Sequence, residues 1–387
     1  MARIVEVAPG DRARTRAFAE FPHRLYAGHA GWAPDGLLRD QRRQLDRTAH
    51  PFHRHSSAAF FVAERGGDVV GRISAIDNLL FNEYQGTSTA FFGHFEATDD
   101  AAVVADLVAA ATDWSLDRGL TSISGPRGLL GFDGSVMVEG FDTSPVLGVP
   151  YNPPYYDEHL QAAGLEPEED FVTGYILASV SIPDAVYAIA DKVAEKGSYV
   201  IKRLSSRREL AEWVPAIKEA YLTSVAELDS FYPPTDEEID DLIGTVLRIA
   251  NPKGISLVLR EHDVVGFLFS YPNLAPALRA ARGRLLPFGW YHLLRARSAE
   301  RWYCVNGLGL LPEHRGRGAN AMLYATLART ATELGWEGGH ILQVAAGNAA
   351  SIKDMEKLAT VWTARHRRYG MALDGRTPSG GRIGSDD

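Results

Sequence analysis

The order of predicted strands and helices in the first half of the chain recurs in the second half. Each half is expected to contain a strand, one or two helices, a hairpin, an aromatic-rich strand, a long helix, a strand, a short helix and a last strand. Polar turns at residues 65–68 and 261–263 mark the two hairpins. A mixed sheet with helices on both faces, occurring twice, accounts for this order. We therefore expect an α/β protein built from two similar modules.

The length of 387 residues is sufficient for two or three domains. A Pro-Asp pair at residues 183–184 predicts the start of a helix that ends at Lys196-Gly197, and we interpret this helix as a connector. The predicted organisation is an N-terminal module over residues 1–180, the connecting helix over 181–198, a C-terminal module over 199–374 and a disordered tail over 375–387. Residues 125–154 are rich in Gly, Pro and Asp and predict a long irregular loop.

Composition excludes several classes of protein. The net charge of -9 argues against a protein that coats nucleic acid. No segment approaches the ~20 apolar residues of a membrane span, and the N-terminus shows no secretory signal. Cys304 is the single cysteine, which excludes an intramolecular disulfide and a Cys-based zinc cluster. We expect a cytoplasmic protein without a nucleic-acid or membrane partner, in which an oligomer is possible.

Three histidines, His50, His53 and His55, have a spacing that is compatible with a metal site. Only Asp46 lies close to them in sequence as a further ligand, and a loop that contains a proline does not place all three on one helical face. A structural or surface role is favoured, and no metal site is predicted.

Residues 278–301 combine six arginines with aromatic side chains. Such a segment can contact nucleic acid or a membrane surface, can be a solvated insertion, or can form a lid over a substrate. The acidity of the whole chain favours a lid or a packing role.

The segment with the clearest chemistry covers residues 305–323 and reads VNGLGLLPEHRGRGANAML. A strand is predicted to end near Pro312 and a helix to begin near Gly318, so free backbone N–H groups and the helix dipole meet in the loop between them. Gly316 and Gly318 allow the backbone to approach an anion closely, and Arg315 and Arg317 add positive charge. This pattern predicts a site for a phosphate or pyrophosphate.

The run from Leu311 to Asn320 resembles the Q/R-x-x-G-x-G/A signature of the GNAT acyltransferase superfamily. Arg315 and Gly318 match its first two fixed positions, while Asn320 replaces the third. The sequence Gly347-Asn348-Ala349-Ala350-Ser351 is similar to the N-x-x-A/S motif of the family, whose usual tyrosine is replaced here by Met355.

Nearly the whole chain resembles a bacterial group of two-module GNAT proteins. This wider resemblance is carried by His50-Pro51-Phe52, Gly71-Arg72-Ile73, Phe92-Gly93-His94-Phe95-Glu96, Gly125-Pro126, Gly140-Phe141-Asp142 and the YNPPYY run at 151–156. It implies tandem GNAT-like folds and an N-acyltransferase that uses an acyl-CoA, with acetyl-CoA as the expected donor and a small-molecule amine as acceptor. The acidic run 97–100 replaces the anion loop in the first half, so the N-terminal module is expected to be degenerate.

The resemblance places the CoA site in the C-terminal module. The residues expected to form it are Leu308, Leu310, Leu311, Arg315, Gly316, Arg317, Gly318, Ala319, Asn320, Asn348 and Ser351. Glu300, Tyr303 and His340 lie at the starts of the neighbouring strands and are the candidates for catalytic acid–base roles. The alternative is a non-catalytic GNAT-fold protein that binds CoA or a partner, which Asn320 and Met355 favour.

Overall fold

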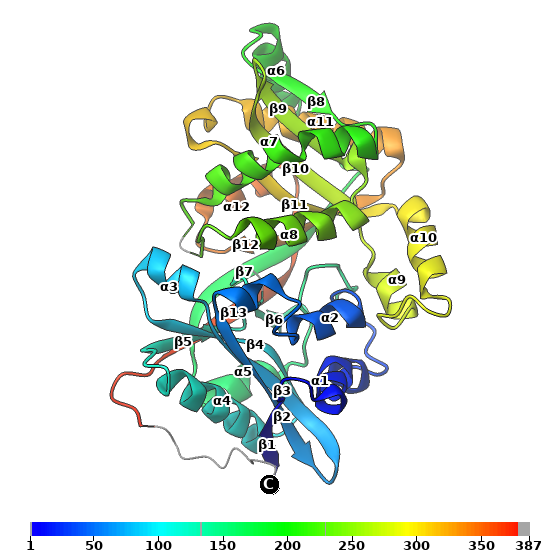
Figure 1. Ribbon diagram of the computed structural model, residues 1–387. Coiled ribbons are helices and arrows are strands. Elements are labelled where there is room, and N and C mark those ends of the chain that lie inside the picture. Colours follow the sequence, from blue (N-terminus) through cyan, green and yellow to red (C-terminus); the bar gives the residue numbers. More distant parts are fainter. Residues whose placement is uncertain (1, 132–133, 229, 378–387) are drawn as a thin grey trace.

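The computed structural model describes residues 2–131, 134–228 and 230–377. Within them, both halves of the chain contribute to one continuous sheet of thirteen strands, with helices on its faces (Figure 1). The strand order is β1-β2-β3-β4-β5-β13-β7-β12-β11-β10-β9-β8, and β6 pairs with β13 beside this path. No helix among the described residues combines the length and the apolar character needed to span a bilayer.

The first half contributes seven strands and five α-helices. Its strands are β1 (Arg3–Glu6), β2 (Ser57–Arg65), β3 (Asp68–Asp77), β4 (Thr89–Ala97), β5 (Ser122–Gly125), β6 (Val136–Glu139) and β7 (Glu166–Leu177). Its helices are α1 (Arg12–Leu25), α2 (Leu38–Gln44), α3 (Leu79–Gln85), α4 (Ala101–Leu116) and α5 (Tyr155–Ala162), with a 3-10 turn η1 (Pro51–Arg54). The predicted irregular loop therefore contains a short strand, β6. The many Gly and Pro residues around it are typical of loops, so the sequence pattern did not predict this strand.

The second half contributes six strands and seven α-helices. Its strands are β8 (Val200–Arg203), β9 (Ile255–Arg260), β10 (Asp263–Pro272), β11 (Trp302–Leu310), β12 (Gly338–Ala345) and β13 (Val361–Ala372). Its helices are α6 (Asp184–Glu195), α7 (Arg207–Val225), α8 (Asp236–Ile249), α9 (Ala275–Ala280), α10 (Gly289–Ala299), α11 (Ala319–Leu334) and α12 (Ala349–Lys357), with 3-10 turns η2 (Pro252–Gly254) and η3 (Pro312–His314). Most of the predicted tail, from residue 378 on, lies outside the described residues.

The last strands of the two halves are exchanged at the centre of the sheet. Strand β13 lies between β5 and β7, where Gly370 opposes Ser124. Strand β7 lies in turn between β13 and β12, where Gly174 opposes Ile341. In Figure 1 the red β13 and the green β7 lie side by side between the two halves. Each half thus completes the sheet of the other, while the residue boundaries of the modules remain a prediction.

Helix α6, the predicted connector, packs on the C-terminal half. Its Ala190 is buried in the core that α11 forms with β9, β10 and β11, and Val193 packs against that core. Helix α6 is amphipathic: its apolar residues are spaced along the face that packs on this core, and Asp191 and Lys192 lie on the exposed face. The helix therefore lies beside the loop that precedes α11, which is the predicted anion site.

Candidate functional site

Strands β11 and β12 form a fork at the centre of the C-terminal half. They pair in parallel from Trp302 opposite Gly338 to Val305 opposite Ile341, and the pairing ends there. The register between β11 and β10 shifts at the same place, which leaves a bulge at Asn306-Gly307, and Gly307 has a φ of +93°. Because the bulge bends β11 away from β12, its backbone groups beyond Val305 have no partner on β12 and are available to a ligand.

The loop between β11 and α11 has the geometry of an anion site. Gly316 and Gly318 have φ values of +71° and +88°, which a residue with a Cβ adopts only at a cost. Gly318 is the N-cap of α11, and no side chain caps this helix end. The first N–H groups of α11 are therefore left for a bound anion. Arg317 beside them is exposed and has no carboxylate partner among the described residues.

Arg315 has another role than the sequence predicts. Its guanidinium donates to Glu227 Oε2 at 2.6 Å, to the carbonyl of Leu310 at 3.2 Å and to that of Ser224 at 3.1 Å. These bonds tie the loop to the end of α7, so Arg315 holds the loop in place and does not point freely into it. Arg317 is the arginine that remains for the anion.

The other predicted CoA residues divide into caps, packing residues and one unpaired amide. Asn348 caps α12 by accepting from the Ser351 N–H at 3.0 Å. Leu308, Leu310, Leu311 and Ala319 pack in the core beneath α11. The Asn320 amide oxygen is buried and finds no hydrogen-bond partner among the described residues. A buried acceptor without a partner is costly, and a ligand or water at the loop would satisfy it.

The corresponding place in the N-terminal half is closed. Asp100 caps α4 by accepting from the N–H groups of Ala102 and Val103 at 3.0 and 3.2 Å. These bonds and the ion pair with Arg65 hold the pKa of Asp100 below its usual value, so a carboxylate occupies the helix end that an anion would need. The fork of β4 and β5 is filled as well, since the Arg127 N–H donates to the Phe92 carbonyl at 2.7 Å.

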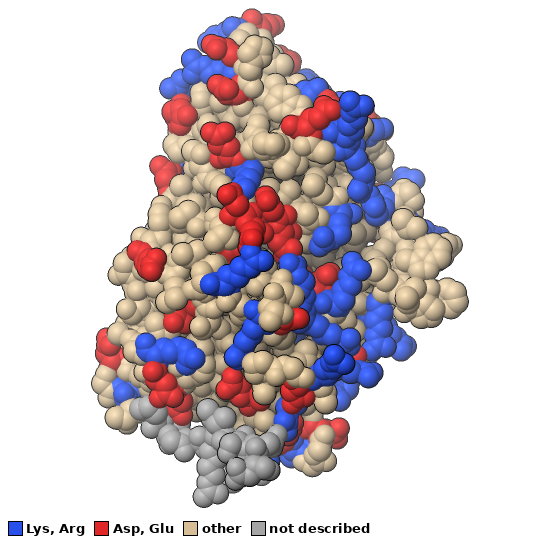
Figure 2. Space-filling view, in the orientation of Figure 1, with Lys and Arg blue, Asp and Glu red and all other residues tan. Residues whose placement is uncertain are grey.

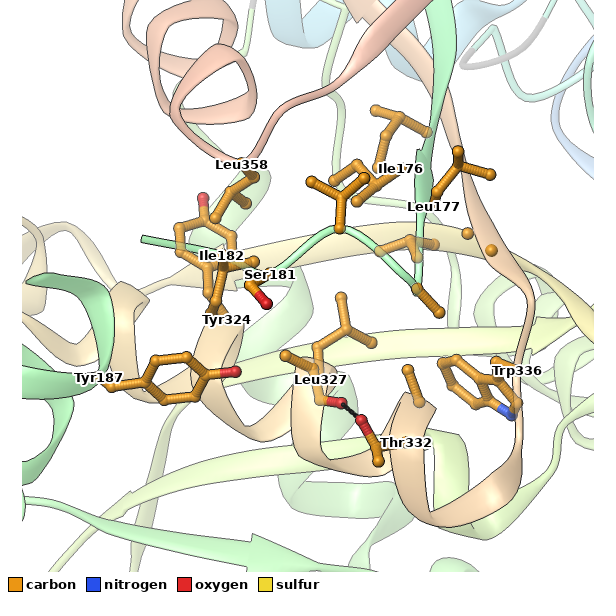
Figure 3. A pocket seen from close by; sticks show the side chains of 18 residues that line it. Ile176, Leu177, Ser181, Ile182, Tyr187, Tyr324, Leu327, Thr332, Trp336 and Leu358 are labelled. Carbon is orange, nitrogen blue, oxygen red and sulfur yellow. Dashed lines mark hydrogen bonds between the residues drawn. The ribbon is translucent and has the colours of Figure 1, made fainter. Parts of the chain in front are cut away.

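An apolar cavity of about 140 Å³ begins at the β11–β12 fork and lies on the α11 side of the sheet. Val305, Gly339 and Ile341 form its floor, while α11 and the segment 176–182 form its walls (Figure 3). Tyr324 of α11 and Tyr187 of α6 both line the cavity, and Figure 3 shows the Tyr324 ring directed toward the end of α12 near Leu358. Burial and, to a lesser degree, Asp354 raise the pKa of Tyr324, so its hydroxyl keeps its proton at neutral pH.

A second cavity, of about 460 Å³, borders the same fork from the other face of the sheet. Side chains alternate between faces along a strand, so His340 and Trp302 face this cavity while Gly339 faces the first. Glu300 and Pro276 lie at its edge, and residues 143–146 of the first half also line it. Ile341, at the end of the β11–β12 pairing, contributes to the lining of both cavities.

The structure brings together two of the three predicted catalytic residues. Glu300 and His340 line the second cavity. Burial lowers the pKa of His340 to about 4, so its imidazole is neutral at pH 7 and can accept a proton. Tyr303 faces the other way: its ring stacks on Trp336 at 3.8 Å, and its hydroxyl accepts from the Asn251 amide at 3.3 Å. Tyr303 is a buried core residue and lines neither cavity.

Sequence reasoning missed Tyr324, Trp302 and the loop 143–149. Tyr324 follows the anion loop by less than two helical turns, and this spacing is a signal that could have identified it. The loop carries no such signal, because only the exchange of strands brings the first half to this cavity.

The three histidines whose spacing is compatible with a metal site each have a different hydrogen-bond partner. His53 Nε2 is 2.8 Å from the Gln44 carbonyl, and His55 lies between Ser56 Oγ and Glu238 Oε1 at 2.7 and 2.9 Å. His50 Nδ1 accepts from the Phe52 N–H. Among the residues that the structure describes, no group of three or more His, Cys, Asp or Glu could hold a metal ion.

Comparison with known proteins gives a family and several relatives. Residues 215–359, which contain the fork, the loop and α12, match the acetyltransferase (GNAT) family. The chain is 29% identical over 283 residues to Protein YghO of Escherichia coli, covering 72% of this chain and 71% of that protein. It is also 29% identical over 286 residues to a bacterial ceramide synthase of Caulobacter vibrioides, covering 73% of both chains.

Solved structures resemble the chain over its whole length. A tandem GNAT protein from the clavulanic acid biosynthesis pathway, solved without AcCoA, matches with a TM-score of 0.58 at 12% identity, covering 97% of this chain and 100% of that chain. A GCN5-related N-acetyltransferase from Sphaerobacter thermophilus matches with a TM-score of 0.51 at 12% identity, covering 96% of both chains. At such identities the likeness concerns the fold, including its division into two modules.

Proposed function

We propose that the chain is a tandem GNAT protein whose C-terminal module transfers an acyl group from a CoA thioester to the amine of a small molecule. The observation that carries this proposal is the fork of β11 and β12, whose residues line both cavities and which is followed by the uncapped N-terminus of α11. The loop at 315–318 would hold the pyrophosphate, and the free edge of β11 would hydrogen-bond the pantetheine.

From the two cavities we infer separate places for the donor and the acceptor. The apolar cavity lies on the same face as α11 and the anion loop, so it suits the acyl group of the thioester. The larger cavity on the other face contains His340 and Glu300 and suits the amine. A neutral amine that reaches the fork would attack the thioester carbon, forming a C–N bond and breaking the C–S bond. As the C–N bond forms, the attacking nitrogen would lose its extra proton to His340 or water. Tyr324 would protonate the departing thiolate and would regain its proton from water.

The volume of the apolar cavity indicates the length of the acyl chain that it can hold. An apolar cavity of roughly 150 Å³ is large enough to bind benzene. The cavity of about 140 Å³ therefore has room for about six carbons, which is more than an acetyl group needs. The similarity to a ceramide synthase, a name that denotes formation of an N-acyl lipid, points in the same direction. We propose a donor with a medium acyl chain, of about six carbons, in place of acetyl-CoA.

The test compares acyl-CoA donors of increasing chain length, in the unmodified chain and in a variant whose larger side chain fills the apolar cavity. Thiol release from acetyl-, hexanoyl- and palmitoyl-CoA is measured with a panel of amines that includes a long-chain amino alcohol. Ala328→Phe, in the wall of the cavity, is expected to lower the rate with hexanoyl-CoA by roughly tenfold and to leave binding of free CoA unchanged. Ala105→Phe, on the exposed surface of α4, is the matched control. Equal rates for all donors in both variants would contradict the assignment of this cavity.

A second candidate function is CoA binding without catalysis. It is favoured by Arg315, which is engaged with Glu227, and by Met355, which cannot supply a proton. Tight CoA binding without thiol release across the whole panel would support this candidate over the enzyme.

A further inference from the structure

The insertion between β10 and β11 carries the largest exposed apolar group on the described chain. Five large side chains there are between 47% and 78% exposed: Leu286, Phe288, Trp290, Tyr291 and Leu294. They occupy the start of α10 and the turn before it, and Trp290, Tyr291 and Leu294 share one face of the helix. Figure 1 shows α9 and α10 projecting from the side of the molecule. An apolar group of this size on a protein surface marks an interaction site.

The charged side chains within the insertion that carries this apolar group are all positive. Residues 275–299 contain five arginines and neither Asp nor Glu, although the whole chain has a net charge of -9. Figure 2 shows the tan lobe at the position of α9 and α10 with blue side chains beside it. Arg284 pairs with Glu20 and Arg279 donates to the Ala30 carbonyl, so both tie the base of the insertion to the first half. Arg282 and Arg295 are exposed.

We propose that the insertion 275–299 docks the protein on the surface of an anionic phospholipid membrane. Aromatic and leucine side chains on one side of a short helix would enter the boundary between headgroups and acyl chains, and the arginines would meet lipid phosphates. The sequence-based expectation of no membrane partner rested on the lack of a membrane span, and the acidity of the whole chain favoured a lid or packing role for this segment; neither property describes this surface. Nucleic acid is the less suitable partner, because the exposed leucines offer it nothing to bind.

The position of the insertion connects this surface to the acceptor cavity. Pro276 at its start and Glu300 just after its end both line the second cavity. A membrane under α10 would therefore lie beside the entrance for the amine. Delivery of a lipid amine by this route rests on the proposed function, whereas docking itself does not.

The experiment is co-sedimentation of the full chain with vesicles of phosphatidylcholine alone and of phosphatidylcholine mixed with phosphatidylglycerol. Binding is expected for the mixed vesicles and is expected to weaken with salt. Phe288→Ser combined with Trp290→Ser should weaken it by roughly tenfold or more. Leu79→Ser combined with Val200→Ser removes exposed apolar side chains elsewhere and should have no effect.

Two outcomes would overturn the proposal. One is equal vesicle binding by both double variants and by the unmodified chain. The other is a stable dimer in solution that Phe288→Ser with Trp290→Ser dissociates, since the surface would then bind a second copy. Circular dichroism shows whether each variant is folded, and CoA binding, measured separately, shows whether the proposed function fails independently of docking.

Discussion

The loop before α11 allows a quantitative test with two neighbouring glycines. Gly316 and Gly318 both have positive φ, but their surroundings differ. A Cβ at Gly316 would meet nothing within 4 Å, whereas a Cβ at Gly318 would lie 2.8 Å from Val193 Cγ2 of α6. Gly316→Ala therefore probes backbone strain alone, and Gly318→Ala probes strain together with an overlap.

The expected magnitudes follow from these two contributions. A left-handed backbone costs an alanine about 1–2 kcal/mol, so Gly316→Ala should lower the free energy of unfolding by about that amount. The overlap with the stiff β-branched Val193 adds about 1–3 kcal/mol for Gly318→Ala. Adding Val193→Ala to Gly318→Ala should remove the overlap. A double-mutant cycle should therefore give a coupling energy of about 1 kcal/mol or more.

Urea denaturation followed by circular dichroism measures all four free energies of unfolding, including that of Val193→Ala alone. Equal costs for Gly316→Ala and Gly318→Ala, together with zero coupling to Val193, would refute the described packing of α6 on the anion loop.

Two further predictions concern proton transfer and acid stability. Tyr324→Phe should reduce thiol release by roughly tenfold without changing CoA affinity, and an unchanged rate would mean that water protonates the thiolate. His366 on β13 is fully buried, and burial lowers its pKa to about 4. Because the unfolded chain takes up this proton near pH 6.5, stability is lost as the pH falls from 6.5 toward 4. His366→Gln should therefore lose roughly 2 kcal/mol less than the unmodified chain between pH 7 and 5, and an identical loss would contradict the assignment.

Local patterns in the sequence were sufficient for much of the fold. The hairpin turn at Gly66-Gly67 and the glycines of the loop before α11 each act through neighbouring residues, and each lies where it was predicted. The exchange of β7 and β13 was not predictable in this way. Both segments have ordinary strand patterns, and their partners lie in the other half of the chain.

In the candidate site, too, features set by neighbouring residues were predictable and features set by distant residues were not. The loop before α11 is local, and its glycines with positive φ lie where they were predicted, while its binding of an anion remains a prediction. The role of Arg315 depends on Glu227, which lies far away in sequence. Tyr303 and His340 were both placed at the starts of neighbouring strands, yet the position of each residue in the alternation of side chains along its strand decides which face of the sheet it reaches. Which face a side chain reaches depends on the register of its strand in the sheet, and the sequence pattern of a strand alone does not determine that register.

The central claim is that one CoA site exists per chain and that it lies at the fork of β11 and β12. Isothermal titration of the full chain with CoA tests it most directly. We expect a stoichiometry of one, and Arg317→Glu should weaken binding strongly while Arg295→Glu, an equal charge change on α10, should not. A stoichiometry of two, or binding that Arg317→Glu leaves intact and that replacement of Asp100 alters, would contradict the account.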